Sequence, residues 1–249
     1  MAKRCLAAAS STPTSVSRRC EHDWLRGAEP LGTFGVDSMI EVRSAYVVRA
    51  KDIRDATALW REGREKVWPQ LEWGGRLQQM LHGHCQQSLF VWSSTWSSMA
   101  EWEAGMKRTG DVADYKSWSA ELNKLRLYGA EREVFTPFGS TEPLDGTPGR
   151  IEIRSAYSVR MEQIAEAKRL MTQGQNEVWP AFGWSGQNQQ MLHGRASQSQ
   201  FVWTSTWESL GEWETAMART GGHAVFQPWY QQFLAAVDTG SSREIFRNL

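Results

Sequence analysis

Two histidines, His82 and His193, close the same string, QQMLHG, in two distant parts of the chain. A neutral imidazole can take a proton from an acidic phenol or carbon acid, or ligate a haem iron, because its pKa lies near neutral pH. A histidine in this position could equally be structural and hydrogen-bond to a neighbouring strand or to a tryptophan N–H. We take His82 and His193 as the candidate catalytic residues and keep the structural interpretation open.

His82 and His84 form an H-x-H pair beside Cys85, and this spacing can bind a metal ion. The second copy of the string is followed instead by Arg195 and Ala196, and no carboxylate or third histidine lies nearby in the sequence. We therefore predict no metal site and interpret the pair as polar residues of a turn.

Further candidates for substrate binding lie on the predicted strands. In a regular strand, Gln78 and Met80 share the face of the histidine, and this mixed polarity is typical of a ligand pocket. Arg43 could hold a substrate carboxylate or pair with Glu41, and Tyr46 on the opposite face could be a core tyrosine. The candidate substrate-binding residues are Arg43, Tyr46, Gln78, Trp92, Trp96, Arg154, Tyr157, Gln189, Trp203 and Trp207.

These candidates recur because the chain contains a tandem repeat. Residues 40–138 match residues 151–249 without a gap, each position pairing with the one 111 residues later (151 − 40 = 111). Roughly 45 of about 99 aligned positions are identical. The segment 51–67 differs strongly from its counterpart, whereas QQMLHG and FVW-ST-W are almost unchanged. The inner strands are therefore more constrained than the first helix.

Tryptophan is unusually frequent in this sequence, which has 14 tryptophans and 5 tyrosines. Twelve of them are six positions used twice, once in each copy. Core packing can account for many of these side chains, but the excess favours a planar aromatic ligand stacked between sheet and helices.

Each copy has the same predicted order of elements. In the first copy the predicted strands are 40–48, 77–83, 88–96 and 132–135, and the predicted helices are 51–67, 99–108 and 112–128. Ser97 and Ser98 can cap the second helix. The order β-α-β-β-α-(α)-β is that of the ferredoxin-like unit.

A single sheet of this kind leaves one face bare, and a duplicated copy can cover it. We therefore predict an α+β fold in which two ferredoxin-like βαββαβ repeats form an intramolecular pseudo-dimeric α/β barrel. The expected domains are residues 39–138 and 150–249, joined by a turn-rich linker at 139–149. Residues 1–38 have no counterpart in the repeat and are expected to be a disordered or non-native extension, with a targeting segment as an alternative.

The balance of positive and negative residues argues against some classes of binding partner. The 28 Lys and Arg residues balance 28 Asp and Glu residues, so no long-range field gathers phosphates or an anionic membrane surface. We expect no nucleic acid and no membrane partner. Three cysteines, an odd number, argue against a disulfide framework and fit a reducing, cytoplasmic location.

The strings IEVRSAYVVR and FVWSSTWSSMAEWEAGM resemble the dimeric α/β barrel superfamily, and within it most closely NIPSNAP-type domains. The residues that carry the resemblance are Glu41, Arg43, Tyr46 (displaced by one position), and the segments 92–99 and 203–210. The superfamily includes cofactor-free quinone-forming monooxygenases, haem-dependent enzymes and polyketide cyclases, so fold alone does not choose among them.

The resemblance implies a NIPSNAP-like small-molecule-binding protein, expected to be an enzyme that oxidises an aromatic or polyketide-like substrate without a cofactor or with haem. Two alternatives stay open at this point: a non-catalytic ligand-binding or interaction protein, and a polyketide-type cyclase. The expected partner is a small aromatic or apolar ligand. The expected assembly is a monomer with pseudo-two-fold symmetry, or a homo-oligomer of such units.

Overall fold

In the computed structural model, the described residues are 39–83, 88–127, 130–140, 143–194 and 199–249. The extension 1–38, the predicted turn near Cys85 and Gln86, and His84 of the H-x-H pair lie outside the described residues.

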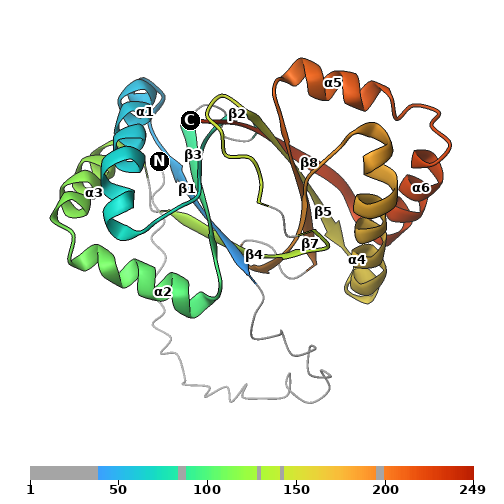
Figure 1. Cartoon of the computed structure of the whole chain (residues 1–249), viewed down its shortest axis with the longest axis horizontal. Coiled ribbons are helices and arrows are strands. Elements are labelled where there is room, and N and C mark those ends of the chain that lie inside the picture. The colour runs from blue at the N-terminus through green and yellow to red at the C-terminus, as the bar shows by residue number, and fades with distance from the viewer. Residues whose placement is uncertain (1–38, 84–87, 128–129, 141–142, 195–198) are drawn as a thin grey trace, which may run out of the picture. The chain divides into compact units, whose positions relative to one another are not determined.

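The two repeats form the same succession of elements (Figure 1). The first repeat consists of β1 (Ile40–Val47), α1 (Ile53–Glu62), β2 (Arg76–His82), β3 (Leu89–Trp96), α2 (Met99–Lys107), α3 (Ala113–Leu125) and β4 (Glu131–Phe138). The second repeat consists of β5 (Ile151–Val159), α4 (Ile164–Gln173), β6 (Gln187–His193), β7 (Gln200–Trp207), α5 (Leu210–Ala218), α6 (Phe226–Ala236) and β8 (Val237–Asn248). Helices α1 and α4 each continue into a π-helical turn, at Gly63–Val67 and Gly174–Val178.

The local sequence explains why these elements begin and end as they do. Alternation in β1 turns Glu41 and Arg43 to one face and Tyr46 to the other, as predicted. Helix α2 begins at the predicted cap, where the Ser98 hydroxyl accepts a hydrogen bond from the backbone N–H of Glu101 at 3.2 Å. The Glu101 carboxylate in turn accepts from the backbone N–H of Ser97 at 2.5 Å. This reciprocal pairing satisfies two N–H groups that the helix cannot satisfy itself.

The eight strands close into an antiparallel barrel in the order β1-β3-β2-β8-β5-β7-β6-β4. The strands of the first repeat are contiguous in this order, as are those of the second. The two sets meet where β2 pairs with β8 and where β4 pairs with β6. The predicted α+β barrel of about eight strands is therefore confirmed.

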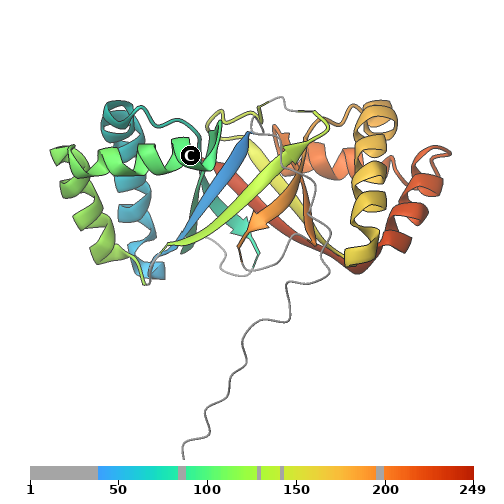
Figure 2. The same cartoon turned by 90° about the horizontal axis from the view of Figure 1, so that it is seen from below.

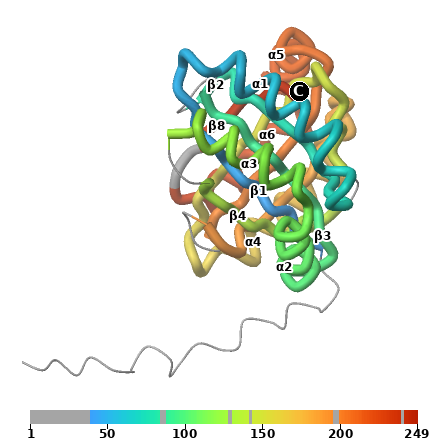
Figure 3. Tube along the Cα trace, turned by 90° about the vertical axis from the view of Figure 1, so that its left-hand side faces the viewer, coloured from blue at the N-terminus to red at the C-terminus, as the bar shows by residue number. Residues whose placement is uncertain are grey.

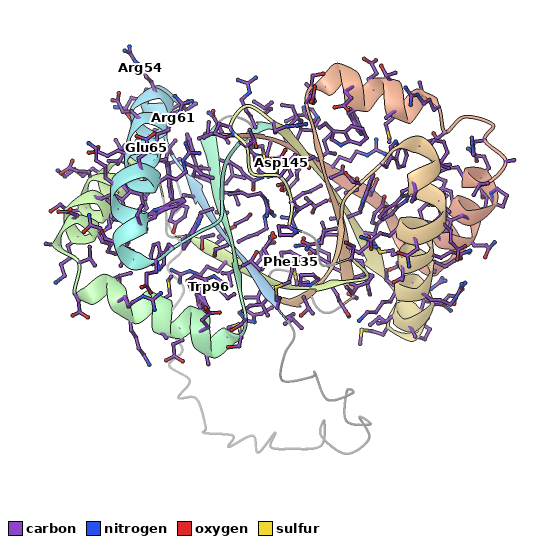
Figure 4. All side chains as sticks on the ribbon, viewed as in Figure 1. Arg54, Arg61, Glu65, Trp96, Phe135 and Asp145 are labelled. Carbon is purple, nitrogen blue, oxygen red and sulfur yellow. The ribbon has the colours of Figure 1, made fainter. Side chains whose placement is uncertain are left out.

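The helices lie outside the barrel in two groups, α1–α3 on one side and α4–α6 on the opposite side (Figure 2). The side with α1–α3 faces the viewer in Figure 3. Each group covers its own sheet face and encloses a core rich in tryptophan. Arg54 and Arg61 on α1 and Glu65 in the π-helical turn that follows are exposed and project into solvent (Figure 4). Among the described residues, no helix combines the length and apolar character needed to cross a bilayer.

The barrel interior is polar at its centre. Arg76 on β2 is 8% exposed, and its guanidinium donates to Glu41 at 3.1 Å and to Glu152 at 2.9 Å. Burial alone lowers the pKa of Arg76, but Glu152 and Glu41 together raise this pKa above its ordinary value. One arginine thus binds a carboxylate from each repeat. The position of the second repeat that aligns with Arg76 is Gln187, not a second arginine.

Candidate functional site

A cavity of about 260 Å³ lies in the second repeat, between the sheet and helices α4, α5 and α6. Its lining residues are Ser155, Tyr157, Met171, Trp179, Trp184, Trp203, Trp213, Met217, Thr220, Phe226, Gln227, Trp229, Tyr230, Gln231, Phe233 and Arg243. For scale, an engineered cavity of about 150 Å³ binds benzene. The volume is therefore suited to a ligand of two to three fused rings.

The walls of this cavity are aromatic and mutually braced. Trp203 lies 4.7 Å from Trp179 and 5.5 Å from Trp184 between ring centroids. Trp229 stacks on Phe233 at 5.7 Å, with only 2° between the ring planes. These rings hold one another in fixed orientations, so the cavity offers flat, pre-formed surfaces to a planar ligand.

One charged side chain lines the cavity. The guanidinium of Arg243 lies 5.7 Å from the ring of Trp213, and no other charged side chain lines the cavity among the described residues. Burial raises the pKa of the Tyr157 phenol, and Tyr230 adds to this effect, while Arg243 and hydrogen bonds with Ser155 and Ser241 oppose it. Tyr157 is therefore neutral at neutral pH and can donate a hydrogen bond beside a permanent positive charge.

The matching space in the first repeat is almost filled, with a volume of about 20 Å³. Position 171 is Met in the second repeat, and its counterpart 60 is Trp. The Trp60 ring lies 4.9 Å from Tyr46, 6.1 Å from Trp68 and 5.2 Å from Trp118. These three are the counterparts of Tyr157, Trp179 and Trp229, so Trp60 occupies the space that is open in the second repeat.

The two candidate catalytic histidines lie elsewhere. The pairing register shifts between Met80 and His82 on β2 and between Met191 and His193 on β6, so a bulge interrupts each strand before its histidine. Gln78 and Met80 face the barrel interior, whereas both imidazoles are exposed and neither lines the cavity. The regular strand assumed for the shared face of Gln78, Met80 and His82 is therefore not formed, because a bulge changes the alternation of side chains.

Four polar candidates lie inside the barrel. Arg43 pairs with Glu133 at 3.4 Å and with Glu244 at 3.8 Å, not with Glu41 as expected, because Glu41 is bound by Arg76. Arg154 lies 4.9 Å from the ring of Phe135, which Figure 4 labels on β4. Gln78 and Gln189 are fully buried and hydrogen-bond within the barrel. None of these four lines the cavity.

Of the remaining candidates, Tyr157 and Trp203 line the cavity, and Tyr46 and Trp92 line its small counterpart in the first repeat. Trp96 and Trp207 are held in place by N–H donation to Ser94 and Ser205, at 2.8 Å each, and lie outside both spaces.

The sequence reasoning missed Met171 and Arg243 as cavity residues. Arg243 follows the alternation of β8, in which Phe246 points into the barrel and Arg243 points toward the helices. Met171 could have been found by comparing the copies position by position, because it aligns with Trp60, a much bulkier residue. Among the described residues, no cluster of three or more His, Cys, Asp or Glu side chains is placed to hold a metal ion.

Tyrosine burial leads to a testable pH dependence. Burial raises the pKa of both Tyr46 and Tyr157 above the ordinary value of 10.0. The folded protein therefore holds these protons more tightly than the unfolded chain, so this contribution to stability is complete below about pH 10 and is lost as the pH rises further. In urea unfolding, the Tyr46→Phe/Tyr157→Phe variant should lose less stability than the wild type between about pH 9.5 and 11.5. An equal loss in both proteins would contradict the assignment.

No protein-family model matches the sequence, and no curated protein matches it. Solved structures match at low identity. A "putative monooxygenase" from Fusobacterium nucleatum subsp. nucleatum ATCC 25586 has a TM-score of 0.64 at 8% identity, over 86% of this chain and 93% of that chain. An anthrone oxidase-like protein has a TM-score of 0.55 at 13% identity, over 86% and 92% of the two chains.

A NIPSNAP family protein from Agrobacterium tumefaciens str. C58 is also among the matched structures, with a TM-score of 0.35 at 17% identity, over 41% of this chain and 88% of that chain. The "putative monooxygenase" and the anthrone oxidase-like protein each span most of this chain, and both show a shared fold. This chain has the dimeric α/β barrel fold that the sequence resemblance implied.

Proposed function

We propose that the second repeat binds a planar aromatic molecule of two to three rings that carries an acidic phenol or enol oxygen. The observation that carries this proposal is the single charged side chain, Arg243, in a cavity whose lining residues are mostly aromatic. The rings supply stacking surface, and the guanidinium with the neutral Tyr157 phenol stabilises an anionic oxygen. A ligand bound in this way is held as its oxyanion.

The proposed reaction is oxidation of that anion by dioxygen without a cofactor. An aromatic oxyanion is electron-rich at a conjugated ring carbon, and dioxygen can add there. For a CH₂ group of an anthrone-type ring, loss of one proton and addition of O₂ give a peroxide anion, which takes a proton back to become a hydroperoxide. Loss of water then leaves a ketone, so that CH₂ and O₂ become C=O and H₂O. The matched anthrone oxidase-like structure supports this choice of substrate class.

Haem is not part of the proposal. The residues that line the cavity include neither histidine nor cysteine, which are the usual protein ligands of haem iron. A polyketide-type cyclase would use the same cavity, but about 260 Å³ is small for an extended chain that must fold within it.

Non-catalytic binding is the second candidate, and one observation favours it. No carboxylate or imidazole lines the cavity among the described residues, so no side chain is placed as a general base. Oxidation then depends on a substrate acidic enough to ionise beside Arg243. A catalytic role for His82 and His193 stays a prediction, as does the cytoplasmic location.

The origin of the barrel is part of the same proposal. The contiguous strand sets β4-β1-β3-β2 and β8-β5-β7-β6 support a duplicated ferredoxin-like unit whose two copies share one closed sheet. We expect the chain to act as a monomer, because the second copy supplies within one chain what a homodimer supplies with two.

The first experiment measures whether the site stabilises an oxyanion. We expect 1-naphthol to bind and to ionise at lower pH when bound than when free, as followed by the absorbance of naphtholate. Arg243→Gln should abolish this shift, because it removes the cation and keeps a polar, though shorter, side chain. Arg132→Gln is the matched control, since Arg132 lies 5.8 Å from Trp102 in the first repeat as Arg243 lies over Trp213. An unshifted ionisation, or an equal effect of both variants, would contradict the proposal.

The second experiment measures the reaction. With anthrone, we expect one O₂ consumed per quinone formed, and a rate lowered by about 10–1000-fold in Arg243→Gln. The variants His82→Ala and His193→Ala test the histidines in the same assay. Binding of 1-naphthol without quinone formation above the buffer rate would leave the non-catalytic function.

A further inference from the structure

We infer that the protein has one working ligand site, in the second repeat. The side chains at the aligned positions 60 and 171 determine which repeat can bind a ligand. Trp60 fills the space between sheet and helices in the first repeat. Met171 leaves the corresponding cavity of the second repeat unfilled and limits the size of the ligand that fits there. This inference rests on the proposed function, because it concerns occupancy of the same cavity.

The contacts of Trp60 carry the first step. It is 1% exposed and touches three aromatic side chains whose counterparts line the open cavity. Met171 is equally buried, at 1% exposed, and lines the cavity from helix α4. The two repeats therefore place different side chains at one point, and the bulkier indole occupies the ligand's volume.

A second difference lies on the helices α2 and α5. A Cβ at Gly105 would lie 2.6 Å from the Trp96 ring, so the close approach of α2 to β3 requires glycine. The counterpart of Gly105 is Ala216, which has a Cβ and is buried. Helix α5 therefore carries a Cβ at the position where α2 has none, so the contact between helix and sheet differs between the two repeats.

Two indole N–H groups differ between the repeats, although the buried Nε1 atoms of Trp60 and Trp68 in the first repeat also have no hydrogen-bond partner among the described residues. In the first repeat, Trp73 donates to the carbonyl of Gly105 at 3.4 Å, and Trp92 donates to the carbonyl of Gly74 at 3.1 Å. Their counterparts Trp184 and Trp203 line the open cavity, and the buried Nε1 atoms of both have no hydrogen-bond partner among the described residues. Leaving a buried donor unpaired is unfavourable, so an acceptor on a bound ligand, or water, would stabilise this side.

The test counts sites by titration calorimetry with 1-naphthol on the full chain. Wild type is expected to bind one equivalent. Met171→Trp copies the first repeat and should weaken binding by at least about a hundredfold, because the indole fills the ligand's space. Trp60→Met copies the second repeat and should raise the stoichiometry from one to two. Ile53→Met is the control, since Ile53 lies on α1 in the same core but does not line the space.

A smaller side chain tests the size limit. Met171→Ala should improve binding of the three-ring anthrone relative to 1-naphthol, and the ratio of the two affinities is the measurement. An unchanged ratio would overturn the role of Met171 in ligand size.

The outcomes separate the two proposals. If wild type binds neither 1-naphthol nor anthrone, the proposed function is wrong, and the one-site inference is wrong with it. If wild type binds but Met171→Trp binds equally well, only the inference is overturned. A folded Trp60→Met variant that still binds one equivalent also overturns it. Should Trp60→Met fail to fold, Met171→Trp alone decides, because it enlarges a side chain beside an open space.

Discussion

Replacement of Arg76 by methionine is expected to lower the free energy of unfolding by about 3–5 kcal/mol. Among the described residues, Arg76 forms ion pairs with both Glu41 and Glu152, and these two residues are at most 3% exposed. Without the guanidinium, two charges from different repeats face each other in a medium of low dielectric. Urea unfolding at pH 7 measures the loss.

Two variants serve as controls for Arg76→Met. The triple variant Arg76→Met/Glu41→Gln/Glu152→Gln should recover a large part of the stability, because it removes the stranded charges. Arg169→Met should cost only about 0–1 kcal/mol, because the Arg169–Glu166 pair is exposed to solvent. A loss below about 1 kcal/mol in Arg76→Met would show that the ion pairs do not hold the two repeats together.

Gly75→Ala is expected to destabilise the protein by about 2–5 kcal/mol, the second large effect. Gly75 has a φ of +120°, a conformation that L side chains rarely adopt. An added Cβ would overlap the backbone carbonyl oxygen of Ser93 and lie 3.0 Å from Nε1 of Trp92. Neither neighbour can rotate away, since one is backbone in a paired strand and the other is a buried indole.

The adjacent residue provides the matched control for Gly75→Ala. An added Cβ at Gly74 meets nothing within 4 Å, and the backbone there has no positive φ. Gly74→Ala should therefore change stability by less than about 0.5 kcal/mol. Equal effects at the two positions would mean that neither the backbone conformation nor the close approach matters.

Local patterns predicted most of the scaffold. Alternation in residues 40–48 identified β1 and assigned Arg43 and Tyr46 to opposite faces, because successive side chains of a strand point to opposite sides. Ser98 was recognisable as a cap from its position before an amphipathic segment. The gapless repeat, together with the bare face of a single sheet, predicted a closed barrel.

The same patterns predicted that His82 shares a strand face with Gln78 and Met80. This prediction was wrong because a bulge precedes the histidine, and a bulge arises from pairing with another strand. His82 pairs with Ile245 and Met80 with Phe246, so β2 uses one more residue than β8 over this stretch. Nothing in the string QQMLHG shows that extra residue. It follows from how β2 fits against a strand far away in the sequence.

By itself, the sequence determined the elements, their faces, the duplication and the wealth of tryptophan. Each of these depends on neighbours along the chain or on direct comparison of the copies. Only the tertiary structure decided that Trp60 fills one space while Met171 leaves the other open, and that Arg76 serves Glu41 and Glu152 together. The physical reason is that cavities and buried ion pairs are formed by side chains from several elements, and their existence depends on how closely those elements approach one another.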